Sequence, residues 1–341
     1  MKHYYSFIIL LLSLYACQSE TTKNVFSYAD FANTKDSLTA EQIQAHITYI
    51  PLDTSKKAMF GSFQSLFLSE EYFFIQTPDG ILQFNRQGKF LRTLCRVGRG
   101  PAECEYILGL TINNKNKRAY IKGFTSCLEF DFNGNFIVNH NLTGMWWNFL
   151  VTDNGELLAN PYNGMGNAED KLVISTLRGD TLKRFNNYQL FSMEQNFMMP
   201  YLSAFNPYGN DVIFRQQFSD TVFTFQPITR TLTPRYVFDF NGLGLTPEVL
   251  AKGGQALDNH VYVSELYEDS QYIYLCLSEK RKSRLYLIRK GENKIYRSAI
   301  RMKEYNNWIF KPISIHKNTL ATMVSPENEN ENYVIVLLEY K

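Results

Sequence analysis

The sequence has few cysteines and almost no charge imbalance. Its 341 residues include five cysteines, and 35 lysines and arginines stand against 33 aspartates and glutamates, a formal net charge of +2. Five cysteines are too few for a disulfide-built scaffold. A nucleic-acid binder needs a basic excess clustered on one face. We therefore predict no nucleic-acid partner.

Long apolar runs are also missing after the first few residues. No later stretch reaches the roughly 20 apolar residues that a membrane-spanning helix needs, and apolar residues at helical spacing are scarce. Aromatic residues, in contrast, are plentiful, with 26 Phe, 22 Tyr and 3 Trp. This apolar surface excludes a disordered chain and predicts a folded globular protein.

The first seventeen residues have the pattern of an export signal. Residues 1–3 are a short basic start, residues 4–14 are apolar, and a small residue then precedes Cys17. The apolar run is too short to span a bilayer, so residues 1–16 are interpreted as a signal peptide. The end of the segment resembles the lipobox of bacterial lipoproteins, and this resemblance implies that Cys17 is lipidated. The alternative is an ordinary secretory signal in which Cys17 is incidental.

The residues after the signal are polar. Residues 17–45 are rich in Thr, Ser, Asn and Lys, and we interpret them as the lipidated Cys17 and a tether. Acyl chains on Cys17 would make the membrane a partner of the protein. Only one acid, Glu20, follows the cysteine closely, which leaves the membrane face open. We predict a lipid-anchored protein of the cell envelope, on the periplasmic or the surface-exposed side of the outer membrane.

A strand, a polar turn and a second strand recur along the rest of the chain. Six copies can be aligned, at residues 65–76, 110–122, 150–160, 205–215, 265–276 and 313–324. Equivalent positions in successive copies are 38 to 60 residues apart. A β pattern with this period predicts the blades of a propeller.

A second hairpin follows most of these copies. It places a glycine in a tight turn, namely Gly88, Gly134, Gly179 and Gly291, because such turns require a positive φ. Residues 223–240 form a weaker match without the glycine. Each unit therefore has four strands.

The sixth unit shows how the ring closes. Its third strand, residues 333–338, is followed by the end of the given sequence, and an unassigned apolar segment lies upstream at residues 46–52. We predict that this segment supplies the missing outer strand and removes an exposed sheet edge. The expected fold is all-β, a six-bladed propeller over residues 46–341 with four-stranded blades and an N-terminal closing strand. A jelly roll or sandwich is the alternative, against which six countable units argue.

Residues 81–112 carry a resemblance to a known family. Phe84, Gly88, Lys89 and Phe90, and then Gly98, Gly100, Pro101 and Glu103, match two motifs of the six-bladed β-propeller lipoproteins of Gram-negative gut bacteria. Those proteins are related to NHL-repeat and TolB-like propellers. Cys95, Ala102 and Cys104 depart from the pattern. The resemblance implies the propeller fold and transfers no catalytic residue.

The long connections all join the outer strand of one blade to the inner strand of the next. They are residues 96–106, 186–199 and 241–259. Connections of this kind share one face of a propeller, and functional loops gather on such rigid scaffolds. In the third, Thr246 and Pro247 predict the start of a short helix that stops at Gly253.

The second long connection supplies candidate ligand-binding aromatics. Tyr188, Phe197 and Tyr201 are the main ones, because aromatic rings stack on sugars and on peptide side chains. The alternative is that these residues cap the core. Trp146 begins the inner strand of the third blade and faces either the channel or the core.

Two arginines of the first long connection are further candidates. Arg96 and Arg99 flank Gly98 and could clamp a carboxylate or phosphate; the alternative is that they pair with Glu103 or Glu105. Cys95 and Cys104 on the same connection could form a disulfide in an oxidising compartment, and otherwise are two buried thiols.

No local motif for catalysis is present, and no catalytic residue, metal ligand or cofactor is predicted. The histidines after the signal, His46, His140, His260 and His316, are not at metal-ligand spacing. A site assembled from several blades would draw on His260, Glu265, Asp153 and Asp211. Cys127 and Cys276 are expected to be free core residues.

The function predicted from these features is binding or scaffolding. We expect a membrane-anchored envelope lipoprotein whose loop-rich face takes a glycan, a peptide or a partner protein. The alternative is a hydrolase or lyase that acts on a carbohydrate or lactone in the channel. A purely structural subunit of an envelope complex is a third class.

Overall fold

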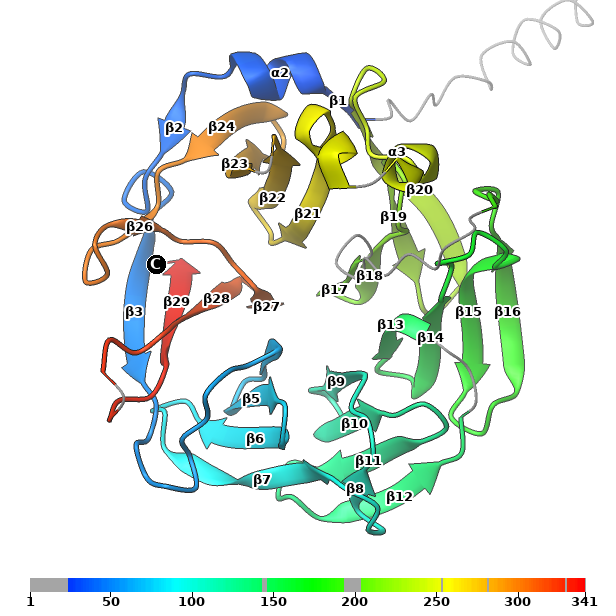
Figure 1. Ribbon diagram of the computed structural model, residues 1–341, viewed down its shortest axis with the longest axis vertical. Coiled ribbons are helices and arrows are strands. Elements are labelled where there is room, and N and C mark those ends of the chain that lie inside the picture. Colours follow the sequence, from blue (N-terminus) through cyan, green and yellow to red (C-terminus); the bar gives the residue numbers. More distant parts are fainter. Residues whose placement is uncertain are drawn as a thin grey trace, which may run out of the picture.

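Six β-sheets surround a central axis like the blades of a propeller (Figure 1). The computed structural model describes residues 24–142, 146–192, 204–252, 254–280, 282–328 and 330–340. The predicted signal peptide, Cys17, Phe197 and Tyr201 lie outside these ranges. Within them, no helix is long and apolar enough to cross a membrane. The six-bladed all-β fold predicted from the repeats is confirmed.

The first four strands of blades 1 to 5 run outward from the axis in chain order, whereas the outermost strand of blade 6 comes from the N-terminal part of the chain. Blade 1 consists of β4 (Ser65–Leu68), β5 (Tyr72–Thr77), β6 (Gly80–Asn85), β7 (Phe90–Val97) and β8 (Glu103–Cys104). Blade 2 consists of β9 (Gly109–Asn113), β10 (Arg118–Lys122), β11 (Cys127–Asp131) and β12 (Phe136–His140). Blade 3 consists of β13 (Trp146–Val151), β14 (Glu156–Pro161), β15 (Asp170–Thr176) and β16 (Thr181–Asn186).

The second half of the ring repeats this order. Blade 4 consists of β17 (Ala204–Tyr208), β18 (Asp211–Arg215), β19 (Thr221–Gln226) and β20 (Thr231–Asp239). Blade 5 consists of β21 (Val261–Glu268), β22 (Tyr272–Glu279), β23 (Lys282–Arg289) and β24 (Lys294–Ser298). Blade 6 consists of β27 (Ser314–His316), β28 (Thr319–Val324), β29 (Val334–Tyr340) and β3 (Ala45–Pro51).

The core lies in layers between neighbouring blades, because the middle strands bury side chains on both faces. In blade 1, Phe73 and Ile75 are fully buried and pack with Ile335 of blade 6. Blades 3 and 4 are joined in the same way by Leu158, Ile174, Phe214 and Phe225, among others. At roughly 25 cal/mol per Å² of buried apolar surface, these layers stabilise the ring.

The four predicted hairpin glycines all have positive φ. The angles are 81° at Gly88, 86° at Gly134, 94° at Gly179 and 83° at Gly291. Gly88 has a second constraint, because a Cβ built on it would lie 2.2 Å from the Pro51 carbonyl oxygen. No other residue fits where the closing strand ends.

The N-terminal strand closes the ring as expected. β3 runs antiparallel to β29, with partners from Ala45 and Tyr340 to Pro51 and Val334. It begins one residue earlier than the predicted segment and ends one residue earlier. The first and last parts of the chain thus share one sheet, and opening the ring requires breaking seven residue pairs.

Residues 24–45, expected to belong to the tether, are folded onto the outer wall. β1 (Asn24–Ser27) pairs in parallel with β20, and β2 (Ser37–Leu38) pairs in parallel with β24. Between them lies α2 (Tyr28–Asn33). We call residues 24–38 the strap; Figure 1 shows it in blue outside blades 4 and 5. Blades 4 and 5 therefore have five strands rather than the predicted four, and β8 is a fifth strand of blade 1.

The strap was predicted to be part of a tether because its apolar residues are few. Phe26 is 4% exposed, Phe31 is 0% exposed and Leu38 is 6% exposed. Tyr28 donates a hydrogen bond of 2.5 Å to Glu279, and burial together with that carboxylate raises the pKa of Tyr28 to about 12. Isolated anchors in a polar stretch give no periodic signal, so composition alone predicts a tether.

Candidate functional site

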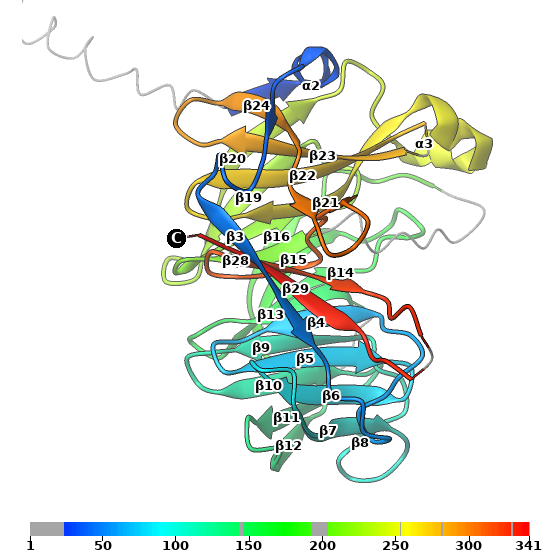
Figure 2. The same cartoon turned by 90° about the vertical axis from the view of Figure 1, so that its left-hand side faces the viewer.

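The connections from outer to inner strands gather on one face of the propeller, the loop-rich face. The longest, residues 240–260, holds α3 (Pro247–Ala251) and η2 (Gly254–Asn259), which project from this face in Figure 2. The predicted helix start is confirmed, since the Thr246 hydroxyl caps α3 by accepting from the Val249 amide at 3.3 Å. Residues 299–313, which were not among the predicted long connections, also join an outer strand to an inner strand and contain the hairpin of β25 (Arg301–Met302) and β26 (Trp308–Ile309).

Residues 187–192, which lead away from blade 3, are held firmly on this face. The buried Asn187 donates through its side chain to the Ala168 carbonyl at 2.8 Å and accepts from the Gln216 side chain at 2.8 Å. Gln189 donates to the Phe218 carbonyl at 3.1 Å. Both neighbours of Tyr188 are therefore tied to surrounding loops, and the Tyr188 ring between them is 83% exposed.

Gly166 allows Phe191 to pack closely against its backbone. The Phe191 amide donates to the Gly166 carbonyl at 3.0 Å. Gly166 has a φ of 79°, and a Cβ on it would lie 2.1 Å from the Phe191 carbonyl oxygen. The Phe191 ring meets the Phe218 ring edge-on at 5.8 Å between centroids. Segment 187–192 thereby joins the loops of blades 3 and 4.

An open hollow of about 620 Å³ lies beside Tyr188, which is within the range of small-ligand sites. We call it the Tyr188 hollow. Its lining residues are Glu169, Asp170, Arg184, Asn186, Asn187, Tyr188 and Leu190. Asp170 and Arg184 form an ion pair there, with 14% and 58% of their side chains exposed. The hollow thus combines an exposed ring with paired hydrogen-bond donors and acceptors.

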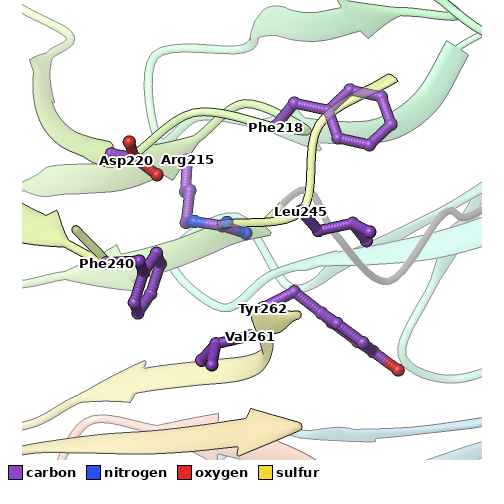
Figure 3. Close-up of a pocket in the computed structure, with 7 residues that line it drawn as sticks. All are labelled: Arg215, Phe218, Asp220, Phe240, Leu245, Val261 and Tyr262. Atoms are coloured by element: carbon purple, nitrogen blue, oxygen red, sulfur yellow. The ribbon is translucent and has the colours of Figure 1, made fainter. Parts of the chain in front are cut away.

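A second pocket lies between blades 4 and 5 on the same face (Figure 3). It is lined by Arg215, Phe218, Asp220, Phe240, Leu245, Val261 and Tyr262. Its volume of about 10 Å³ is room for one water molecule at most. Phe218 borders this pocket and also contacts segment 187–192.

The second pocket contains a buried arginine and a more exposed aspartate. Arg215 is 4% exposed, and burial lowers its pKa to about 10, an effect that Asp220 opposes. Burial likewise raises the pKa of Asp220, and Arg215 opposes that shift. Since the pocket admits no more than a water, it has no room for a larger ligand.

The arginines of the first long connection lie elsewhere on the ring. Arg99 donates two hydrogen bonds to Glu105, at 2.6 Å and 3.1 Å, and its side chain is 84% exposed. Glu103 instead accepts from the Gly100 amide at 2.9 Å. Arg96 is an exposed residue of β7. These arginines follow blade 1, whereas Tyr188 follows blade 3, so the topology does not bring them into one site.

Trp146 packs against a buried lysine at the start of β13. The Lys122 ammonium lies 4.8 Å from the centre of the Trp146 ring and donates to the Phe124 carbonyl at 3.1 Å. Lys122 itself is 0% exposed. Trp146 is partly buried within the cluster between blades 2 and 3. Its surroundings correspond to the core alternative.

Cys95 and Cys104 are separate buried thiols in the structure, which is the alternative to a disulfide. They lie on β7 and β8, and the Cys104 thiol contacts the Tyr106 carbonyl at 3.2 Å. Burial raises the pKa of Cys95 to about 12 and raises the pKa of Cys104. Cys127 and Cys276 are also free and buried, as expected.

The residues considered for a channel-centred reaction do not come together. Asp153 and Asp211 lie at the turns between the first two strands of blades 3 and 4, on the face opposite the loops. His260 directly precedes β21, and Glu265 lies within that strand, where Tyr267 donates to it at 3.3 Å. In the described part of the chain, no group of three His, Cys, Asp or Glu side chains is placed to hold a metal ion.

Residues 23–335 match the family described as a domain of unknown function, DUF4934, and the chain belongs to that family. No curated protein sequence matches the chain significantly.

Among solved structures, the chain is similar to a Bacteroides fragilis protein whose name describes it as exported. The two share 14% identity with a TM-score of 0.70, and the match covers 93% of this chain and 99% of the other. The extracellular domain of a hybrid two-component system from Bacteroides thetaiotaomicron matches at 11% identity and a TM-score of 0.44, over 86% of this chain and 42% of the other. At these identities the first likeness shows a shared fold.

Proposed function

We propose that this member of the DUF4934 family is a lipid-anchored protein of the cell envelope that binds a glycan, a peptide or a partner protein through its loop-rich face. The observation that carries the proposal is the Tyr188 hollow, a ligand-sized depression on the face where the long connections gather. A similarity to NHL-repeat and TolB-like propellers stays a prediction from the motifs of residues 81–112.

The strap supports an anchor that leaves the loop-rich face free. β1 runs parallel to β20, and β20 runs from the turn at 227–230 toward the loop-rich face. β1 therefore runs in the direction from the opposite face to the loop-rich face, beginning beside Tyr236 of β20. Six residues separate Cys17 from Asn24, a span of at most about 25 Å. Lipid on Cys17 would hold that opposite side toward the membrane.

Lipidation is tested by metabolic labelling with an alkyne fatty acid. We expect the wild-type protein to be labelled and to fractionate with membranes, and Cys17→Ser to be unlabelled and soluble. Labelling that persists in Cys17→Ser would contradict the anchor.

The binding face is tested by blocking each face in turn. The four described cysteines are buried, so a new surface cysteine can be modified selectively in the Cys17→Ser protein. Asn167→Cys lies on the loop-rich face, beside the hollow, and Ile228→Cys lies on the opposite face, where Ile228 is 85% exposed. A maleimide polyethylene glycol on position 167 should abolish binding to any ligand found by array screening. The same reagent on position 228 should leave binding unchanged; equal effects would refute the proposal.

A further inference from the structure

We infer that the Tyr188 hollow is a carbohydrate site that takes a neutral sugar residue, with its ring stacked on Tyr188. This inference deepens the proposed function and rests on it. It is carried by the geometry of one exposed ring next to one ion pair, in which Arg184 is exposed and Asp170 is largely buried.

The Tyr188 ring projects from a segment that is held on both sides of it. Its two neighbours, Asn187 and Gln189, are hydrogen-bonded to loops of blades 3 and 4, and the Lys171 ammonium lies 5.9 Å from the centre of the ring. With its neighbours held in this way, the tyrosine has mainly its two side-chain torsions to fix when a ligand stacks on it. Yet 83% of its surface is exposed to water, so stacking has most of the ring available.

The rest of the hollow matches sugar hydroxyls. The Arg184 guanidinium donates to one oxygen of the Asp170 carboxylate, and its further N–H groups remain as donors. Such a pair offers a donor and an acceptor side by side, as two adjacent hydroxyl groups of a sugar require. The exposed side chains of Glu169 and Asn186 add an acceptor and an amide at the rim.

The charges around the hollow favour a neutral ligand. Glu169 and Asp170 supply two negative charges, and Arg184 and Lys171 supply two positive charges. Their sum is zero, so an acidic or basic ligand gains no net attraction. A peptide would have to add to the free edge of β16, where its backbone and not Tyr188 would supply the contacts.

The test is binding of the full-length protein to a microarray of neutral gluco-, manno-, galacto- and xylo-oligosaccharides, with uronic-acid oligosaccharides and peptides on the same slide. Hits are then titrated by calorimetry. We expect a neutral oligosaccharide to bind, Tyr188→Ala to weaken it by about tenfold or more, and Tyr188→Phe to retain most of the affinity, because the ring supplies the contact.

Tyr106→Ala is the matched control. Tyr106 is also an exposed tyrosine of the loop-rich face, 58% exposed, but it belongs to the connection after blade 1. Its removal should leave the affinity unchanged. The inference is overturned if no neutral oligosaccharide binds, or if Tyr188→Ala binds as well as the wild type. Binding of peptides alone that is blocked at position 167 would refute the carbohydrate site and leave the proposed function standing.

Discussion

Two aromatic residues show how surroundings decide a side chain's role. Trp146 covers the ammonium of the buried Lys122, whereas Tyr188 points to water beside a hollow. Both residues occupy junctions between strands and loops, and both are candidates by residue type. The contact that places Trp146 in the core is made by Lys122, which precedes Trp146 by 24 positions in the sequence. Distant contacts of this kind cannot be derived from a local pattern.

His316 allows a prediction about pH at the inner end of blade 6. Its ring contacts the Asn114 side chain of blade 2 at 3.2 Å. Burial, followed by the charge of Lys317, lowers its pKa, while Glu70 acts in the opposite direction. The unfolded chain, with a histidine pKa of about 6.5, therefore takes up protons before the folded state does. This contribution to stability is complete above about pH 6.5 and is lost as the pH falls below that value.

The measurement is urea unfolding at several pH values between 8 and 5. His316→Asn should flatten the decline of the free energy of unfolding below about pH 6.5. The wild-type protein, titrated over the same pH range, is the control. A wild-type slope in His316→Asn would show that other groups cause the decline.

The strap shows what one buried side chain contributes to an element. α2 has only six residues, too few to be stable alone, so its position depends on Phe31. The Phe31 ring is fully buried and meets the Tyr286 ring edge-on at 5.2 Å between centroids.

Phe31→Ala should therefore lower the free energy of unfolding by about 3 to 5 kcal/mol, the usual cost of removing a buried phenyl ring. Val25→Ala, at a strap residue that is 54% exposed, should change it by less than about 0.5 kcal/mol. Both are measured by denaturant titration. Similar small losses in the two variants would mean that the strap does not share in cooperative unfolding.

The whole molecule depends on the closing strand more than on the strap. Deleting residues 46–52 would expose the edge of β29 along its full length, and an exposed edge invites aggregation. We expect this deletion to abolish soluble folding. Deleting residues 24–38 should leave a soluble, less stable ring, since each of blades 4 and 5 keeps its four inner strands.

Size-exclusion chromatography and thermal unfolding of both deletions distinguish these expectations. A variant without residues 46–52 that is monomeric and unfolds at the wild-type temperature would contradict the closure. If the variant without residues 24–38 were insoluble, the strap would be as important for soluble folding as the closing strand.

Most of the fold followed from local features of the sequence. Alternating apolar residues, turns and four glycines define the hairpins, and a missing outer strand at one end matches a spare strand at the other. These signals are local or arise from repetition, and so they survive without coordinates. Apolar anchors spaced as sparsely as those of the strap give no such signal, and so the strap could not be predicted.

The candidate site was only partly predictable for the same reason. The sequence by itself determined the six blades, the closing strand and the face on which long connections gather, with Tyr188 among the candidates. Only the tertiary structure decided that Arg99 pairs with Glu105, that Trp146 covers Lys122, and that Asp170 and Arg184 meet beside Tyr188. Hydrogen-bonding and stacking partners are selected by distance in space, and a sequence pattern records only distance along the chain.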